Sequence, residues 1–114
     1  MNLRISALLL TLAFASGANA STPTGNIAAG KNKAGTCAAC HGDGNKTLDN
    51  TYPKLAGQYP DYLSKALHEY KSGKRKNAIM GGQAANLSDQ DIADLTAYFG
   101  SLHGTVHDLS GHNR

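Results

Sequence analysis

The string Cys37-Ala38-Ala39-Cys40-His41 constrains the fold of this chain more than any other feature of its sequence. Two cysteines that are separated by two residues and followed at once by a histidine are typical of covalent haem attachment. On one helical turn, both thiols can reach the vinyl groups along one porphyrin edge, and the next residue turns its imidazole toward the iron. The string therefore predicts a fold that encloses a large, flat and apolar cofactor.

The N-terminal segment predicts export. Arg4 is its only charged residue, and residues 5–15 form a short, mostly apolar run. Ala18-Asn19-Ala20 fits the small-x-small cleavage rule, so we expect residues 1–20 to be a cleaved signal peptide and Ser21 to be the first mature residue. A retained anchor is the alternative, but the run is shorter than the roughly 20 apolar residues that a spanning helix needs. Haem attachment to such a string is completed outside the cytoplasm, so we expect a periplasmic protein without a permanent membrane anchor.

The remaining chain is long enough for one small domain. Removing residues 1–20 from the 114-residue chain leaves 94 residues. We expect residues 21–104 to form the domain and residues 105–114 to form a poorly ordered tail. A domain of this size buries a modest fraction of its surface, so a haem would supply core that the sequence lacks. The single Cys-x-x-Cys-His string sets the expected number of covalent haem c groups at one.

The charge balance gives little indication of a partner. Without Arg4, the 11 basic residues of the chain become ten, against eight Asp and Glu, and this small excess does not predict nucleic-acid binding. The only dense basic cluster consists of Lys71, Lys74, Arg75 and Lys76. The simpler interpretation is a solvated helix end whose cations complement the negative terminus. A docking patch that steers acidic redox proteins stays open as a hypothesis.

Apolar periodicity predicts an all-α fold with three main helices. They are expected at residues 27–41, 60–73 and 88–104, with Gly-rich loops at 42–57 and 74–87. No run alternates as a strand does. An apolar stripe supports each helix. The first stripe is Ile27, Gly30, Ala34 and Cys37; the second is Tyr59, Leu63, Ala66, Leu67 and Tyr70; the third is Ile92, Leu95, Phe99 and Leu102.

Start and stop signals agree with two of these helices. Pro60 suits the first turn of the second helix, and Gly73 suits its end. Ser88 and Asp91 resemble a capping box at the start of the third helix, and Gly104 is expected to close it.

Met80 is the candidate for a second axial iron ligand. It is the only methionine other than Met1, and Gly81-Gly82 follows it in a predicted loop, where small residues let the backbone pass close to a haem. A methionine that fills a gap in the core is the alternative. We expect ligation, because a Met/His pair is a known haem arrangement.

The histidines outside the string are the competing ligands, since histidine is the common alternative to methionine. They are His68, His103, His107 and His112. His68 falls on the polar face of its predicted helix, and His103 lies in the last turn of the next helix, where a cation is favoured. The other two histidines lie in the tail.

Two haem-free interpretations of the cysteine pair conflict with the predicted helices. A thioredoxin-like pair requires a βαβ context, which the helical pattern does not offer. A zinc site needs two further ligands at finger-like spacing, and the candidates are scattered histidines.

At several separate segments the chain resembles the class I cytochromes c, in particular the small soluble bacterial type with a single haem. The segments are residues 37–42, residues 53–58 (Pro-Lys-Leu-Ala-Gly-Gln), Met80, and residues 87–89 leading into a helix with Tyr98-Phe99. The resemblance implies the small cytochrome c fold, with three main helices wrapped around one covalently bound haem.

The resemblance also implies residue roles. Cys37 and Cys40 would form thioethers with the haem, and His41 and Met80 would be the axial ligands. The carbonyl of Pro53 would accept the imidazole proton of His41, which fixes the ring and tunes the iron.

In the same family the first and last helices cross at a glycine packed against an aromatic residue. Gly30 and either Tyr98 or Phe99 are the corresponding residues. Ala34 stands where some family members carry an aromatic residue, so we expect a thinner crossing. The resemblance extends over nearly all of residues 26–103.

The function that this resemblance implies is that of a one-electron carrier between respiratory redox partners, and not that of an enzyme. The alternative is a haem enzyme or gas sensor with a displaceable sixth ligand. That alternative requires Met80 to be absent from the iron or easily replaced, and it requires a distal acid–base residue.

Overall fold

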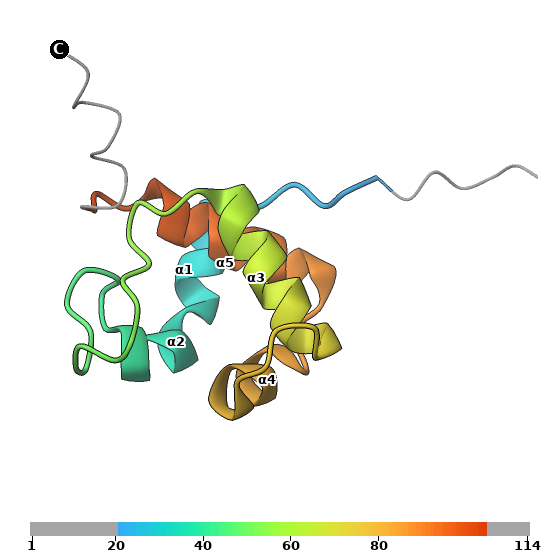
Figure 1. The fold of residues 1–114 in the computed structure, drawn as a ribbon. Helices are drawn as coiled ribbons and strands as arrows, with labels where there is room; N and C mark the ends of the chain where they lie inside the picture. The colour runs from blue at the N-terminus through green and yellow to red at the C-terminus, as the bar shows by residue number, and fades with distance from the viewer. Residues whose placement is uncertain (1–20, 105–114) are drawn as a thin grey trace, which may run out of the picture.

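The computed structural model describes residues 21–104, and within that range the chain is all-α, with five helices and no strand (Figure 1). The helices are α1 (Ile27–Lys33), α2 (Gly35–His41), α3 (Pro60–Ser72), α4 (Ala78–Ala84) and α5 (Asp89–Ser101). The predicted fold class is therefore confirmed. Residues 1–20 and 105–114, which include the expected signal peptide, His107 and His112, lie outside the described residues.

The first predicted helix is two helices, α1 and α2, that meet at Ala34. The backbone of Ala34 has φ −71° and ψ −6°, and its N–H donates to the Lys31 carbonyl in a tightened last turn of α1. A new helix then starts, with Ala38 N–H donating to the Ala34 carbonyl at 2.9 Å. Gly35 follows the break, and glycine is a poor helix former. The single helix predicted over residues 27–41 was wrong in this respect.

Helices α1 and α5 cross at Gly30, as expected. Gly30 is buried, and a Cβ atom placed on it would lie 2.0 Å from the Asp94 carbonyl oxygen and 2.7 Å from the Tyr98 Cβ. Tyr98, and not Phe99, is therefore the aromatic residue at the crossing. Ala34 and Phe99 instead lie together in the buried core.

Helix α3 packs against α5 and α4. Its predicted ends are confirmed, because Pro60 occupies the first turn and Gly73 ends the helix with φ 76°. Leu63 and Ala66 are buried on the inner face. Tyr59 is 57% exposed, against the expectation that it belonged to the apolar stripe, because it precedes the helix with an extended backbone.

Helix α5 starts at the predicted capping box. The Asp91 N–H donates to Ser88 Oγ at 3.0 Å, and the Ser88 N–H donates to Asp91 Oδ2 at 2.9 Å. The helix ends at Ser101, with Leu102 as its cap, and not at Gly104. Ile92, Leu95 and Phe99 from its predicted stripe are buried.

The segment predicted as a loop over residues 74–87 contains α4. Asn77 caps this helix, because its Oδ1 accepts the Met80 N–H at 2.9 Å. Gly81 and Gly82 lower the intrinsic helix propensity of the segment, and for this reason the sequence favoured a loop. The cap and the packing of α4 against α3 offset that weakness. Met80 therefore lies in a helix and not in a loop.

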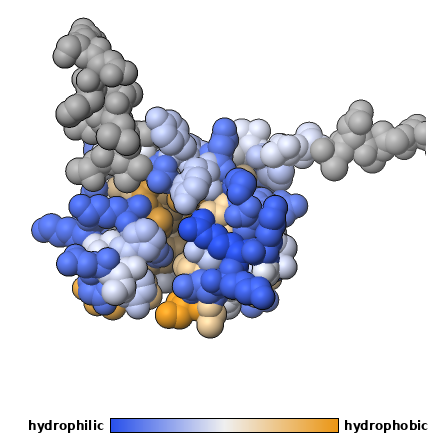
Figure 2. Space-filling model, viewed as in Figure 1, coloured by the Kyte–Doolittle hydropathy of each residue, from blue (hydrophilic) through white to orange (hydrophobic). Residues whose placement is uncertain are grey.

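Few large side chains are fully buried in the described part of the chain. Ile92 is the only large one with less than 2% exposure. The main core cluster is Ala34, Leu63, Leu95 and Phe99, with partly buried Cys37, Leu55, Leu87, Tyr98 and Leu102 around it. Figure 2 shows that this face of the molecule is hollowed at its centre and that apolar residues lie within the hollow. Within residues 21–104, no helix has the length and apolar character needed to cross a membrane.

Candidate haem-binding site

Helix α2 presents both cysteines and the histidine of the string within its last five residues. Cys37 and Cys40 are free thiols and partly buried, whereas His41 is buried with 6% exposure. Residues three apart on a helix are neighbours on one face. The helix therefore places two sulfur atoms side by side and follows them with an imidazole that is shielded from water.

The His41 ring is held by the Pro53 carbonyl. His41 Nδ1 lies 2.8 Å from the Pro53 oxygen, so Nδ1 carries the proton and donates it. This hydrogen bond leaves Nε2 as the nitrogen with a lone pair that can bind iron. A histidine ligand whose other nitrogen donates to a carbonyl has a fixed tautomer and ring direction.

The loop after α2 brings Pro53 to this position. Gly44 accepts the N–H groups of Leu55 and Ala56 at 2.9 and 3.0 Å through its carbonyl, and the Leu48 N–H donates to the Cys40 carbonyl at 2.9 Å. Gly44 has φ 91° and packs against the Ala56 backbone, where a Cβ would come within 3.0 Å. The loop is thus folded back onto α2 by its own backbone hydrogen bonds.

Met80 lies in the first turn of α4. Figure 1 shows α2 and α4 at the same end of the molecule, away from the α1–α5 crossing. Met80 is half-buried, and its N–H is fixed by Asn77. Helix α4 also carries Ile79, which is 57% exposed.

The residues present fit a covalently bound haem. Two free, partly buried thiols and a buried imidazole with an available Nε2 form a donor set suited to it. The thin core and the apolar hollow match the need of a short chain for an apolar group that completes its interior.

The haem-free interpretations of the cysteines find no support in the geometry. Burial raises the pKa of the Cys37 thiol, whereas reactive redox cysteines have a lowered pKa. Residues 21–104 contain no strand for a βαβ unit. Over the same residues, no three His, Cys, Asp or Glu side chains are grouped so as to hold a metal ion.

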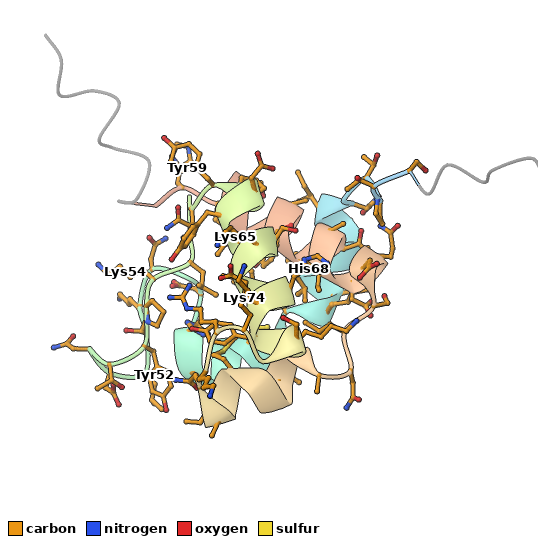
Figure 3. The ribbon with its side chains drawn as sticks, turned by 45° about the vertical axis from the view of Figure 1, so that its right-hand side comes forward. Tyr52, Lys54, Tyr59, Lys65, His68 and Lys74 are labelled. Atoms are coloured by element: carbon orange, nitrogen blue, oxygen red, sulfur yellow. The ribbon has the colours of Figure 1, made fainter. Side chains whose placement is uncertain are left out.

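The two described histidines outside the string lie elsewhere. His68 is exposed on α3, where its Nδ1 donates to the Ser64 carbonyl at 2.8 Å and its Nε2 lies 3.4 Å from Asp89 Oδ1 (Figure 3). It lines a groove of about 470 Å³ between residues 21–25, α3 and α5, and the lining of that groove contains neither His41 nor Met80. His103 is exposed beyond the end of α5.

Three members of the basic cluster make contacts within the chain. Lys71 donates to the Leu87 carbonyl, and the Lys74 Nζ lies 3.9 Å from Glu69 Oε1. The Arg75 guanidinium lies 5.1 Å from the centre of the Tyr70 ring. All four cluster residues are exposed, and Figure 3 shows Lys74 together with Lys65 along α3. The cluster therefore helps to connect α3 with the following segment while it remains at the surface.

Tyr52 and Asn77, which were not predicted from the sequence, contact His41 and cap the helix of Met80, respectively. The Tyr52 ring lies edge-on to His41, with ring centres 6.1 Å apart. An available signal was the position of Tyr52 directly before Pro53. Asn77 caps the helix of Met80, and the signal was an Asn three residues before the methionine.

Residues 21–104 form a small helical domain with two free thiols and a buried imidazole that is hydrogen-bonded to a carbonyl. These features define a class, the proteins that attach haem through a Cys-x-x-Cys-His string. Comparison with known families makes the assignment specific. The Cytochrome c family profile matches residues 27–103. The chain belongs to the cytochrome c family.

Similar proteins include cytochrome c4 from Pseudomonas aeruginosa, which is 51% identical over 107 residues, 93% of this chain and 51% of the relative. Cytochrome c-554(548) from Halomonas halodenitrificans is 46% identical over 68% of this chain and 96% of its own length. The crystal structure of reduced recombinant cytochrome c4 from Pseudomonas stutzeri matches with a TM-score of 0.67 and 40% identity, over 73% of this chain and 48% of that one. The chain spans about half the length of the cytochrome c4 relatives that it matches.

A more distant relative bears a name that states a partner. The thiosulfate dehydrogenase electron acceptor of Thiomonas intermedia is 38% identical over 66% of this chain and 35% of its own length.

Proposed function

We propose that this chain carries single electrons between redox proteins of the periplasm, through one haem c with His41 and Met80 as axial ligands. The family and the cytochrome c4 relatives support a c-type cytochrome that acts in electron transfer. The observation that carries the ligation by His41 is the 2.8 Å hydrogen bond from His41 Nδ1 to the Pro53 carbonyl. It gives the histidine of the attachment string the tautomer that a permanent iron ligand needs.

The chain's own residues would hold the cofactor as follows. Cys37 and Cys40, both on α2, would bond to it covalently, and His41 would bind the iron through Nε2, the nitrogen not bonded to Pro53. When bound, haem supplies the exchange of one electron between the ferrous and ferric states. A histidine and a methionine that both stay on the iron keep this exchange free of large rearrangement, and the methionine favours a high reduction potential.

Met80 is proposed as the second ligand because of its place on α4. Its N–H is bound to Asn77 Oδ1, so the first turn of the helix is fixed at the residue that would bind iron. The exposed His68 is engaged with Ser64 and Asp89, which does not favour it as a ligand. The same arrangement does not favour His68 as the distal acid–base residue of an enzyme or sensor.

Redox proteins are the proposed partners. The relative named as an electron acceptor of thiosulfate dehydrogenase supports this class of partner. The basic cluster would give a positive surface to the end of α3 and the segment after it; its members are Lys71, Lys74, Arg75 and Lys76. Glu69 is an acidic residue there, and it pairs with Lys65 and Lys74. Electron-transfer rates with an acidic partner should then fall steeply as salt is added. An electron-transfer rate that does not depend on ionic strength would contradict a docking role for the basic cluster.

Export to the periplasm is part of the proposal. The apolar run at residues 5–15 and the small residues before Ser21 support it. The mass of the protein isolated from the periplasmic fraction tests it, because the expected N-terminus is Ser21. A protein found only in the cytoplasm would contradict export.

Two measurements test the proposed function, the pyridine haemochrome spectrum and the binding of carbon monoxide. We expect a pyridine haemochrome spectrum that survives acid-acetone extraction, which shows covalent haem c. We expect ferrous protein at neutral pH to bind little carbon monoxide, because both axial positions are filled by His41 and Met80. Ready binding of carbon monoxide would favour the enzyme or sensor alternative.

A further inference from the structure

Tyr52 lies against the His41 ring, which would bind the haem iron. Its ring packs edge-on to the His41 ring, with centres 6.1 Å apart and planes 75° apart. The neighbouring Cys40 side chain raises the pKa of Tyr52. Figure 3 shows Tyr52 beside α2, and the residue is half-buried.

The backbone around Tyr52 is fixed by a tight turn. The Tyr52 N–H donates to the Asp49 carbonyl at 3.3 Å, and the Asp49 carboxylate accepts the N–H and the hydroxyl of Thr51 at 2.7 and 2.5 Å. The preceding Leu48 N–H is bound to the Cys40 carbonyl. Because the turn is tied to α2 at Cys40, the aromatic ring is delivered to a defined place beside His41.

The Pro53 carbonyl alone does not fix the imidazole completely. One hydrogen bond at Nδ1 sets the direction of the N–H group, but it allows the ring plane to turn about the N–H···O line. An aromatic ring packed edge-on to the imidazole resists that turning, because the rings would collide. Pro53 and Tyr52 are adjacent in sequence, so the same loop supplies both restraints.

We infer that Tyr52 is a positioning residue for the haem, acting through the His41 ring plane. This inference rests on the proposed function. The edge-on ring sets the orientation of the axial imidazole.

The test uses the whole haem-loaded protein and three variants. Tyr52→Phe keeps the ring and removes the hydroxyl, whereas Tyr52→Leu removes the ring. Tyr62→Leu is the matched control, because it removes an exposed tyrosine ring from α3. The measurement is the set of proton NMR shifts of the haem methyl groups in the ferric state, which depend on the plane of the axial imidazole.

We expect the order or spread of the haem methyl shifts to change in Tyr52→Leu, and to be kept in Tyr52→Phe, which retains the ring, and in Tyr62→Leu. Unchanged methyl shifts in Tyr52→Leu would overturn the role of the ring.

Two further results have defined meanings. If Tyr52→Leu yields no haem-loaded protein, the same shifts in Tyr52→Met, which fills the space without a flat ring, decide the inference. If the unaltered protein contains no covalent haem, the proposed function fails at that point. Covalent haem whose methyl shifts are insensitive to loss of the Tyr52 ring defeats this inference alone.

Discussion

Lys33 on α1 lies 2.6 Å from Asp94 on α5, measured from Nζ to Oδ2, and the Asp94 side chain is only 4% exposed. The other carboxylate oxygen accepts the Asn26 N–H and the Gln90 Nε2, each at 2.8 Å. A buried carboxylate is tolerated when its oxygens are all paired. Asp94 therefore fastens both ends of α1 to α5, beside the crossing at Gly30.

Replacement of Lys33 should weaken this connection. Lys33→Met leaves the buried Asp94 without its cationic partner, so we expect a lower midpoint of urea unfolding. Lys31→Met is the matched control, since both lysines lie in the last turn of α1 and Lys31 is exposed. Equal midpoints for the two variants would show that the buried pair does not stabilise the fold.

Lys33 also lies 2.7 Å from Asp91, measured from Nζ to Oδ1. The ion-pair group of Lys33, Asp91 and Asp94 predicts a pH dependence of stability. Lys33 holds the pKa of Asp91 and of Asp94 below the ordinary value of 3.8, and the two carboxylates hold the pKa of Lys33 above its ordinary value of 10.5. The contribution of the carboxylates is complete above their ordinary pKa and is lost as the pH falls through their lowered pKa. The contribution of Lys33 is complete below its ordinary pKa and is lost as the pH rises through its raised pKa.

The contribution of Lys33, Asp91 and Asp94 to the free energy of unfolding should thus be constant across neutral pH and should decline below about pH 4. Urea unfolding of wild type and of Lys33→Met, repeated between acid and neutral pH, measures this. The acid decline should be shallower in Lys33→Met. Parallel declines in the two proteins would assign the acid sensitivity to other groups.

Gly30→Ala should separate α1 from α5. The added Cβ would lie 2.0 Å from the Asp94 carbonyl oxygen, so the backbone must move, and we expect a loss of about 1–3 kcal/mol in the free energy of unfolding. Gly35→Ala is the control, because nothing lies within 4 Å of its Cβ position and its φ is not positive. That variant should be neutral or more stable by about 0.5–1 kcal/mol. A Gly30→Ala protein as stable as wild type would contradict the close crossing.

Asn77→Ala should loosen the hold of α4 on Met80. Loss of an Asn cap costs about 1 kcal/mol, so the population with an open first turn should rise by about fivefold. In the ferric protein, added imidazole should then displace Met80 at a lower concentration than in wild type. Asn26→Ala is the control, because Asn26 caps α1 through the same contact, its side chain accepting the Ala29 N–H at 2.9 Å. Equal sensitivity of the two variants to imidazole would show that the α4 cap does not affect the binding of Met80 to iron.

Features that a local pattern encodes could be predicted from the sequence. The string at Cys37, the Pro60 start, the Gly73 stop and the capping box at Ser88 each act within a few residues, and the structure contains the predicted helix starts and stop. Gly30 was found through a family resemblance, since only a neighbouring helix explains the need for a glycine there.

Features that depend on tertiary contacts were missed. The propensity of α4 is low, and the helix is stabilised by packing against α3 and by the Asn77 side chain. The break at Ala34 interrupts an otherwise continuous apolar stripe. Asp94 was not singled out, because a carboxylate on the α5 sequence gives no sign of Lys33 until the helices cross. Tyr52 reaches His41 only after the loop has folded back onto α2.

The ferric absorption spectrum of the haem-loaded protein, compared with that of Met80→Ala, tests whether Met80 is an iron ligand. A methionine sulfur bound to ferric haem iron gives a weak sulfur-to-iron charge-transfer band at long wavelength. We predict that the band is present in the wild-type protein and absent in Met80→Ala, while the pyridine haemochrome of both shows the same covalent haem. A band that persists in Met80→Ala, or that is absent from the wild type, would contradict His41/Met80 ligation and with it the assignment as a simple electron carrier.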